Sequence, residues 1–158
     1  MPDRSAYLDA LHLLAGRELT VKQVRERLRD REHDREEIER AIAHLLETGA
    51  LDDTRVAAAY ARTAIKIKGR GRLRVQRELQ EMGVDRAIAS DTLAEAFGDV
   101  DERTLIANAL KKKLRGKPRI ATAADYARVY QFLMRQGFSP AGVSAALRAY
   151  RRGMPDVE

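Results

Sequence analysis

Three copies of one apolar pattern constrain the fold of this chain more than any other sequence feature. The pattern runs from Leu28 to Ile42 and returns twice along the chain, at offsets of 51 and 54 residues. Each copy opens with a Val four residues before a Leu, a spacing that puts both side chains on one helical face. These pairs are Val24 and Leu28, Val75 and Leu79, and Val129 and Leu133. The pattern therefore predicts three equivalent helical units.

A short turn and a second helix follow the Val-Leu helix in each copy. The turn carries a residue expected to pack inward and then a helix-capping residue: His33-Asp34, Val84-Asp85 and Phe138-Ser139. In the second helix, Ile38, Ile42 and Leu45 correspond to Ala89, Leu93 and Ala96 and to Val143, Leu147 and Tyr150. One helix pair cannot bury its own apolar face, so neighbouring copies must cover one another. We therefore predict an all-α, elongated array.

Capping residues and glycines mark the expected helix ends. Thr20 with Gln23, and Asp34 with Glu37, match the capping box, in which two residues bond each other's backbone N–H groups. Gly49 is expected in the left-handed conformation just past a helix. These signals predict about eight or nine helices, among them residues 5–15, 72–82, 123–136 and 140–152. A further helix after residues 52–53 carries an apolar stripe of Val56, Tyr60, Ala64 and Ile67.

Composition excludes several protein classes. The 158 residues include no Cys, which rules out disulfides and thiolate metal sites. No apolar run approaches the roughly 20 residues of a membrane-spanning helix, and the N-terminus lacks the apolar core of a signal peptide. We therefore expect a soluble, cytoplasmic protein.

The net charge of +6 is concentrated in the middle of the chain. Residues 57–120 carry 15 basic and 8 acidic side chains, whereas residues 1–56 have a net charge of −3. Residues 62–77 and 103–124 each hold seven Lys or Arg and no acidic residue. A solvated helix face can also be basic, but it usually mixes both signs, so these stretches indicate attraction to an anionic polymer or an acidic protein groove. The candidate binding residues are Lys66, Lys68, Arg70, Arg72, Arg74, Lys111, Lys112, Lys113, Arg115, Lys117 and Arg119.

Candidate catalytic groups have simpler structural explanations. Adjacent Asp52 and Asp53 would suit a metal ion or acid–base chemistry, but capping of the following helix accounts for both carboxylates. Arg55, one turn on, is expected to pair with one of them. The three His residues lack metal-ligand spacing, no Ser-His-Asp arrangement is visible, and the Gly-Arg-Gly at 69–71 lacks the rest of a phosphate-binding loop. We predict no catalytic, metal-binding or cofactor-binding residue, and no cofactor.

Several short motifs follow one another in a consistent order. Residues 49–57 read Gly-Ala-Leu-Asp-Asp-Thr-Arg-Val-Ala, with Tyr60 close behind. Lys-Gly-Arg-Gly-Arg follows at 68–72, then Glu78-Leu79 and Gly83-Val84, and finally Phe-Leu-Met-Arg-Gln-Gly-Phe at 132–138. Over nearly the whole chain, these motifs resemble those of the RecX family, bacterial regulators of the RecA recombinase.

Two positions depart from the pattern of that family. Glu32 stands where the first repeat usually has Gly, and Val56 where an aromatic residue commonly follows the Arg. Both positions concern packing more than recognition. We expect Glu32 to replace a left-handed turn with another turn geometry.

The resemblance implies a curved array of three tandem three-helix repeats with helix-turn-helix-like pairs, at residues 1–51, 52–99 and 100–158. It implies a non-enzymatic regulator that lodges in the groove of the RecA filament on DNA. There it would lower the ATPase, recombinase and co-protease activities of RecA, and so regulate DNA repair and recombination. We expect a monomer that binds no membrane, with direct DNA contact left open. The signature residues Leu51, Asp52, Asp53, Arg55 and Tyr60 are expected to be structural.

Two other functions remain open on the sequence alone. A basic DNA-binding helical protein acting alone would use the same basic stretches, and its affinity for naked DNA would fall steeply with salt. A hydrolase built on Asp52 and Asp53 would lose activity but not stability when both become Asn, and we expect the opposite.

Overall fold

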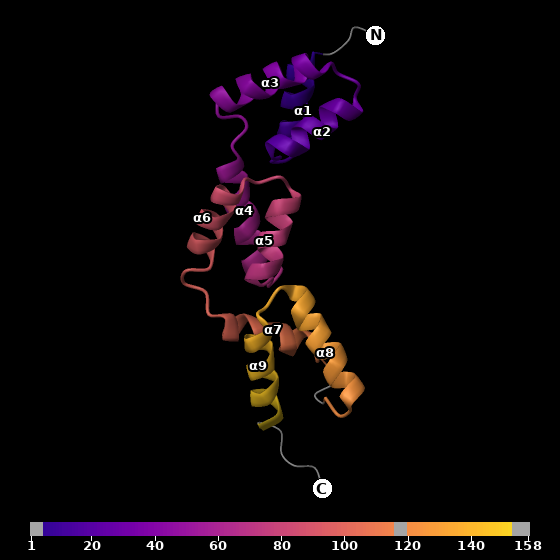
Figure 1. Cartoon of the computed structure of the whole chain (residues 1–158), viewed down its shortest axis with the longest axis vertical. Helices are drawn as coiled ribbons and strands as arrows, with labels where there is room; N and C mark the ends of the chain where they lie inside the picture. Colours follow the sequence, from indigo (N-terminus) through magenta and orange to yellow (C-terminus); the bar gives the residue numbers. More distant parts are fainter. Residues whose placement is uncertain (1–4, 116–119, 153–158) are drawn as a thin grey trace. The chain divides into compact units, whose positions relative to one another are not determined.

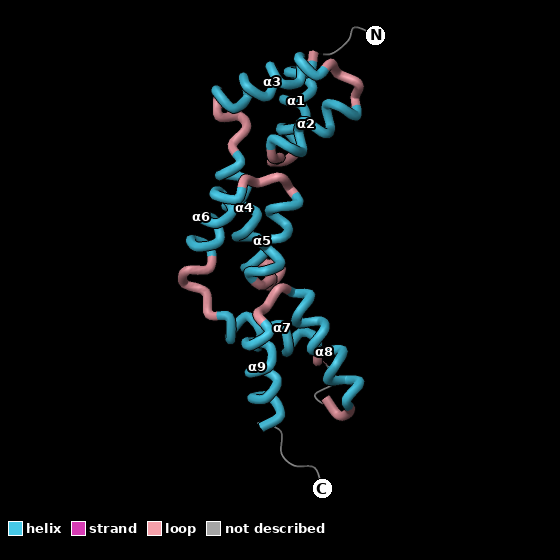
Figure 2. The backbone as a smooth tube through the Cα atoms, in the orientation of Figure 1, coloured by secondary structure: helices cyan, strands magenta, loops and turns pink. Residues whose placement is uncertain are grey.

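The chain is all-α in the part that the structure describes, as the sequence predicts. A computed structural model describes residues 5–115 and 120–152 (Figure 1), and every regular element within them is a helix (Figure 2). The helices are α1 (Ala6–Gly16), α2 (Val21–Asp30), α3 (Arg35–Glu47), α4 (Asp53–Lys66), α5 (Arg72–Glu81), α6 (Arg86–Ala96), α7 (Glu102–Lys113), α8 (Ala123–Gln136) and α9 (Pro140–Arg152).

These helices belong to two compact units. The first unit comprises Met1–Tyr60 and Glu78–Thr92, and the second comprises Ala61–Arg77 and Leu93–Glu158. In the first unit, α1, α2 and α3 pack around a core that includes Val24, Leu28, Ile42 and Leu45. In the second unit, α7, α8 and α9 pack around Ile106, Leu133, Phe138, Val143 and Leu147.

The repeated Val-Leu pairs are the most deeply buried part of this pattern. Leu28, Leu79 and Leu133 are all fully buried, and Val129 is the most exposed member of the three pairs at only 5%. Burying one such side chain contributes about 1.5–3 kcal/mol, so conserving these positions in all three copies serves packing. The helical register predicted from the repeat is therefore confirmed.

The capping predictions are confirmed at one of the two expected capping boxes. Thr20 and Gln23 form both bonds of the box at the start of α2, with lengths of 2.9 and 3.2 Å. The second expected box is wrong, because Asp34 makes no side-chain bond to α3. The Glu37 carboxylate instead accepts the free backbone N–H of Ala6 at 2.9 Å. The sequence predicts that Glu37 caps the start of its own helix, α3, but its carboxylate instead caps the start of α1, where a backbone N–H lacks an intrahelical partner.

His33 packs inward as expected and also has a polar partner. Its Nε2 atom lies 2.6 Å from Oδ2 of Asp9, a residue of α1 that is only 6% exposed. The guanidinium of Arg31 lies 3.3 Å from the other oxygen of the same carboxylate. The turn between α2 and α3 is therefore held on α1 by polar contacts as well as by packing, and this supports the structural interpretation of His33.

Each turn between the second and third helices of a repeat contains a left-handed residue. Gly83 has a φ of 85° and Gly137 a φ of 98°, and the corresponding residue of the first repeat, Glu32, has a φ of 63°. The expected change of turn geometry at Glu32 is therefore wrong. The turn keeps its left-handed form because the helices on both sides fix its path, although a side chain there is strained.

Replacing Glu32 with Gly is expected to stabilise the protein. Gly relieves the left-handed strain, which stabilises the folded state, but it also gives the unfolded chain more conformational entropy, which offsets part of the gain. The free energy of unfolding should therefore rise by about 1 kcal/mol. Urea denaturation of both proteins measures the difference. Glu32→Ala is the control, since it removes the charge but keeps the Cβ atom, and equal stabilisation by Ala would contradict the strain argument.

Each unit contains one joint between consecutive repeats. In a joint, the turn between the second and third helices of one repeat packs on the start of the second helix of the preceding repeat. In the first unit, the turn between α5 and α6 packs on the start of α2: the Thr20 hydroxyl donates to the carbonyl of Met82 at 2.5 Å. A Cβ atom on Gly83 would collide there with the Lys22 side chain. The turn thus fits only because it carries Gly.

In the second unit, the turn between α8 and α9 packs on the start of α5. The N–H groups of Gly71 and Leu73 donate to the carbonyls of Gln136 and Gly137 at 2.7 and 3.1 Å. These donors belong to the unsatisfied first turn of α5, which this neighbouring turn therefore caps. A Cβ atom on Gly137 would collide with the side chain and backbone of Arg74.

Candidate partner-binding surface

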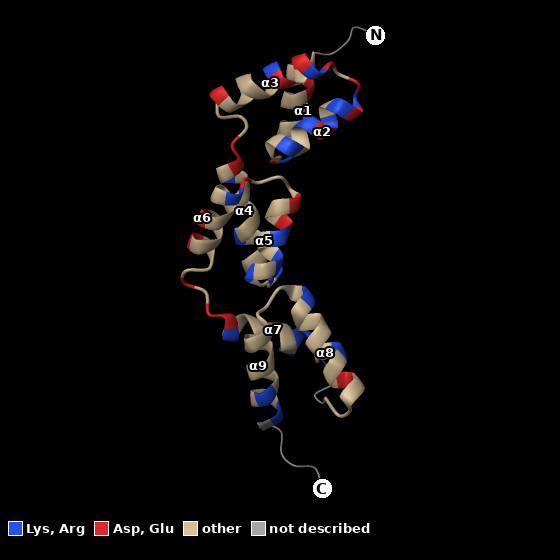
Figure 3. Ribbon diagram, viewed as in Figure 1, with Lys and Arg blue, Asp and Glu red and all other residues tan. Residues whose placement is uncertain are grey.

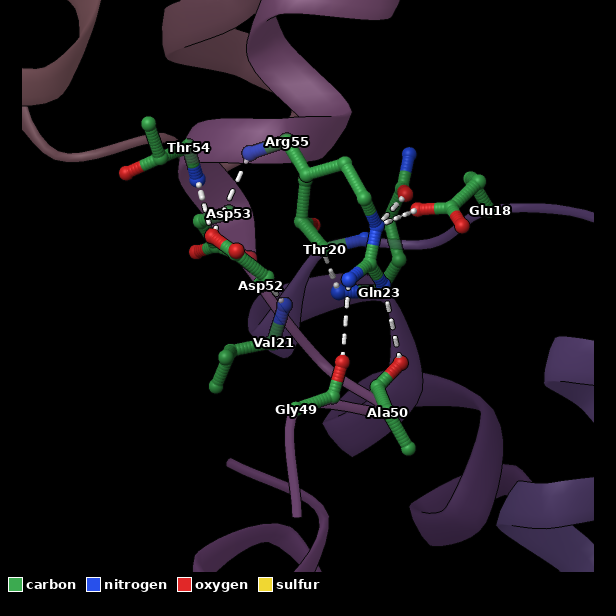
Figure 4. A network of polar contacts seen from close by, with 10 residues as sticks. All are labelled: Glu18, Thr20, Val21, Gln23, Gly49, Ala50, Asp52, Asp53, Thr54 and Arg55. Carbon is green, nitrogen blue, oxygen red and sulfur yellow. Dashed lines mark hydrogen bonds and ion pairs between the residues drawn. The ribbon is translucent and has the colours of Figure 1, made fainter. Parts of the chain in front are cut away.

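The signature segment that includes Asp52 and Asp53 is a structural link inside the first unit (Figure 4). Oδ1 of Asp52 accepts the N–H groups of Thr54 and Arg55 at 3.0 and 3.2 Å, so Asp52 caps α4 as predicted. Asp53 does not cap its own helix. Its Oδ1 accepts the N–H of Val21 at 2.9 Å and thereby caps α2.

Arg55 holds the loop that precedes α4 rather than pairing with either aspartate, so that prediction is wrong. Its guanidinium donates to the carbonyls of Gly49 and Ala50 at 2.9 and 3.2 Å, and its Nε lies 3.2 Å from Glu18 (Figure 4). Carbonyls past a helix end lack intrahelical partners, which explains why they attract this cation.

Leu51 and Tyr60 complete the structural role of this segment. Leu51 is 2% exposed and belongs to the core of the first unit. The hydroxyl of Tyr60 donates to the carboxylate of Glu78. All five signature residues therefore make contacts within the first unit that explain their chemistry without a bound ligand.

Burial raises the pKa of Asp53, and the Val21 N–H opposes that shift. A carboxyl whose pKa is raised in the folded state binds its proton more tightly there than in the unfolded state. The stability that it contributes therefore falls as the pH rises from the ordinary pKa, about 4, to the pKa of the folded protein.

Asp53→Asn keeps an oxygen acceptor for Val21 but does not titrate. Over this window, the unfolding free energy of the Asn variant should rise relative to the original protein, as measured by urea denaturation at several pH values. A constant difference would contradict burial of the charge.

The predicted basic residues lie mainly at helix ends of the second unit. Figure 3 shows the Lys and Arg of the described residues in blue. Lys66 ends α4, Lys68 follows it, and Lys111 and Lys112 lie in the last turn of α7 with Arg115 just beyond. These five side chains belong to exposed residues. Lys117 and Arg119 lie outside the described residues.

One groove of about 990 Å³ in the second unit brings the two basic stretches together. Its lining includes the five cations Lys66, Lys68, Lys111, Lys112 and Arg115. The structure shows no ion pair between any of these five and another described residue. Because the two stretches are about forty residues apart, only the fold could place them on one surface.

The other predicted cations lie elsewhere. Lys113 stands over the ring of Phe132, with its Nζ 4.9 Å from the ring centroid. Arg72 lines a smaller pocket of about 280 Å³. Arg70 and Arg74 are half-buried, and partial burial with the nearby charges of Arg70 and Arg77 lowers the pKa of Arg74. The backbone and Cβ atom of Arg74 lie close to Gly137, so the first role of Arg74 is in the contact with that turn.

Sequence reasoning missed the apolar part of this groove. Ile67, expected on the apolar stripe of α4, is 72% exposed, because α4 ends at Lys66 and a left-handed Gly69 redirects the chain. Ile65 takes the buried position at 7% exposure. Leu105 and Ala109 of α7 and Phe132 of α8 line the same groove. If the predicted helix had ended before Ile67, as α4 does, the sequence would have predicted that Ile67 is exposed.

Other kinds of site find no support in the described residues. Across residues 5–115 and 120–152, no group of three or more His, Asp or Glu residues is placed to hold a metal ion. No helix within that part of the chain is long and apolar enough to span a bilayer.

Comparison with known proteins agrees with the repeat. Three family models match the chain, described as the first, second and third three-helix domains of RecX, at residues 6–45, 52–93 and 101–147. The chain is 34% identical over 145 residues to the regulatory protein RecX of Geobacillus kaustophilus and 33% over 140 residues to that of Halorhodospira halophila. These matches cover 91% and 89% of this chain. The chain spans about half (53%) of the Geobacillus protein and 84% of the Halorhodospira protein.

Solved structures show the same fold. The crystal structure of RecX from Lactobacillus salivarius has a TM-score of 0.73 at 22% identity, covering 93% of this chain and 95% of that one. A second crystal structure, of a regulatory protein RecX, has a TM-score of 0.75 at 21% identity, covering 90% and 70%. With all three domain models matched in order and a relative aligned over most of both chains, this chain belongs to the RecX family of regulatory proteins.

Proposed function

We propose that this protein binds the RecA filament on DNA and lowers the ATPase, recombinase and co-protease activities of RecA, thereby regulating DNA repair and recombination. Membership of the RecX family supports the partner. The observation that carries the mode of action is the groove of the second unit, where five exposed cations from two distant stretches line one surface. We further propose that it acts in the cytoplasm as a monomer.

The chemistry of the described residues favours regulation by occupancy rather than by catalysis. The carboxylates of Asp52 and Asp53 are engaged with helix N-termini, which leaves no reason to invoke a hydrolytic role for them. The five exposed cations of the groove form no ion pair with another described residue, so they can bind an anionic surface without first breaking such a pair. Their charge also speeds the encounter with that surface. A protein seated on the filament can then hinder RecA without forming or breaking a bond.

RecA ATP hydrolysis on single-stranded DNA tests this function directly. Titrating the protein into preassembled filaments should lower the hydrolysis rate in a saturable manner. The control replaces the protein with an equal concentration of a folded basic protein of similar charge. Hydrolysis that stays unchanged at micromolar protein would refute the proposal.

A DNA-binding protein acting alone is the second candidate, because the same five cations would also attract phosphate. Its affinity for naked single-stranded DNA would then fall steeply with salt, by about 0.7 decades per decade of salt for each phosphate contact. Such steep, tight binding in the absence of RecA would favour this candidate.

A further inference from the structure

We propose that the groove of the second unit is a docking site for an acidic polypeptide segment of its partner, anchored by an apolar side chain against Ile67, rather than a track for nucleic acid. The proposal rests on the function proposed above and names the chemistry of the contact. Two independent properties of the groove support it, an unusual apolar exposure and an excess of positive charge.

The apolar property centres on Ile67. At 72% exposure it is the most exposed of the four large apolar side chains that are open to solvent among the described residues. It shares the groove with the half-buried Leu105, Ala109 and Phe132. Burying an exposed branched side chain together with the apolar surface around it favours binding. An aliphatic or aromatic side chain of the partner would bury Ile67 in this way.

The charged property surrounds that apolar centre. Among the described residues that line the groove, five carry a positive charge and only two, Asp99 and Asp101, carry a carboxylate. The Asp101 carboxylate is already bonded to the N–H of Arg103 and the hydroxyl of Thr104, at 3.1 and 3.2 Å. The groove therefore has a clear positive excess, and it complements an occupant that carries several carboxylates.

A nucleic acid suits this lining less well than a peptide. Single-stranded sites stack bases on aromatic rings. Among the described residues that line this groove, only Phe132 is aromatic, and the Lys113 ammonium already lies 4.9 Å from its ring centroid. Ile67 offers nothing to a phosphate. A peptide, in contrast, can alternate carboxylates for the cations with an apolar side chain for Ile67, which is how acidic-motif recognition and apolar anchoring combine in peptide grooves.

Site-directed photo-crosslinking on RecA–DNA filaments tests the proposal. An aliphatic diazirine amino acid replaces Ile67 in one variant and Leu73 in a control variant. Leu73 is 51% exposed and belongs to the same unit but does not line this groove. After irradiation, mass spectrometry identifies the crosslinked partner. The expected product at residue 67 is a RecA peptide with more Asp and Glu than Lys and Arg, at a yield well above that of the control.

A second measurement keeps the proposal testable if the diazirine disturbs the surface. Ile67→Ser should weaken binding to the filament by about tenfold, as loss of one buried aliphatic anchor implies, and leave binding to naked single-stranded DNA unchanged. Crosslinks to DNA or to a neutral or basic peptide, or equal filament binding by Ile67→Ser, would overturn the proposal. If the original protein fails to inhibit RecA at all, the proposed function itself has failed, which is a different result.

Discussion

Gly137→Ala is expected to lower the free energy of unfolding by roughly 3 kcal/mol or more, because it combines a steric collision with left-handed backbone strain. The added Cβ atom would collide with the side chain and backbone of Arg74 and would also strain a φ of 98°. Moving the turn to relieve the collision would stretch the bonds from Gly71 and Leu73 to the turn carbonyls, so the joint loses both packing and capping. Urea denaturation followed by circular dichroism measures the loss.

Two other glycines separate the causes of this effect. Gly69→Ala adds a Cβ at a φ of 63° with no other atom within 4 Å, so it should cost only the left-handed strain of about 1–2 kcal/mol. Gly16→Ala has open space and no positive φ, and should be nearly neutral or slightly stabilising. If Gly137→Ala proves no more destabilising than Gly69→Ala, the joint does not depend on this close approach.

Reversing the charge of the groove should cause the largest functional loss. The double variant Lys66→Glu with Lys112→Glu changes one cation from each basic stretch and replaces attraction by repulsion. Affinity for the RecA filament should fall by at least about tenfold, with little change in stability because both side chains are exposed. Inhibition of RecA ATP hydrolysis as a function of protein concentration gives the change in affinity, and a thermal melt gives the stability.

The control for that experiment has the same net charge. Arg27→Glu with Arg40→Glu reverses two exposed cations of the first unit that do not line the groove. It should inhibit RecA nearly as well as the original protein. Equal losses in both double variants would mean that only net charge matters, and the groove would have no special role.

Much of the fold could be predicted from the sequence because its determinants are local. Val24 with Leu28 and the corresponding pairs have the spacing of one helical face, and Thr20 with Gln23 cap a helix through residues three positions apart. The failures share a tertiary cause. Glu37 bonds Ala6 across the first unit, and the strained turn at Glu32 is held by the helices around it.

The candidate site could be predicted only in part, for the same reason. Charge bias along the sequence identified Lys66, Lys68, Lys111 and Lys112, but not that they would line one groove. It also could not separate from them Lys113, which stands over Phe132, or Arg74, which packs against Gly137. Ile67 was missed because its apolar character fits a buried stripe, and only the end of α4 places it in solvent.

The measurement that tests the central claim most directly compares two ligands at one salt concentration. Fluorescently labelled protein is titrated with RecA-coated single-stranded DNA and with the same DNA lacking RecA, at roughly 150 mM salt, where weak phosphate attraction is screened. We predict that the filament binds at least about tenfold more tightly than the naked strand. Equal affinity for the two, or tighter binding to naked DNA, would contradict the proposal that the RecA filament is the partner.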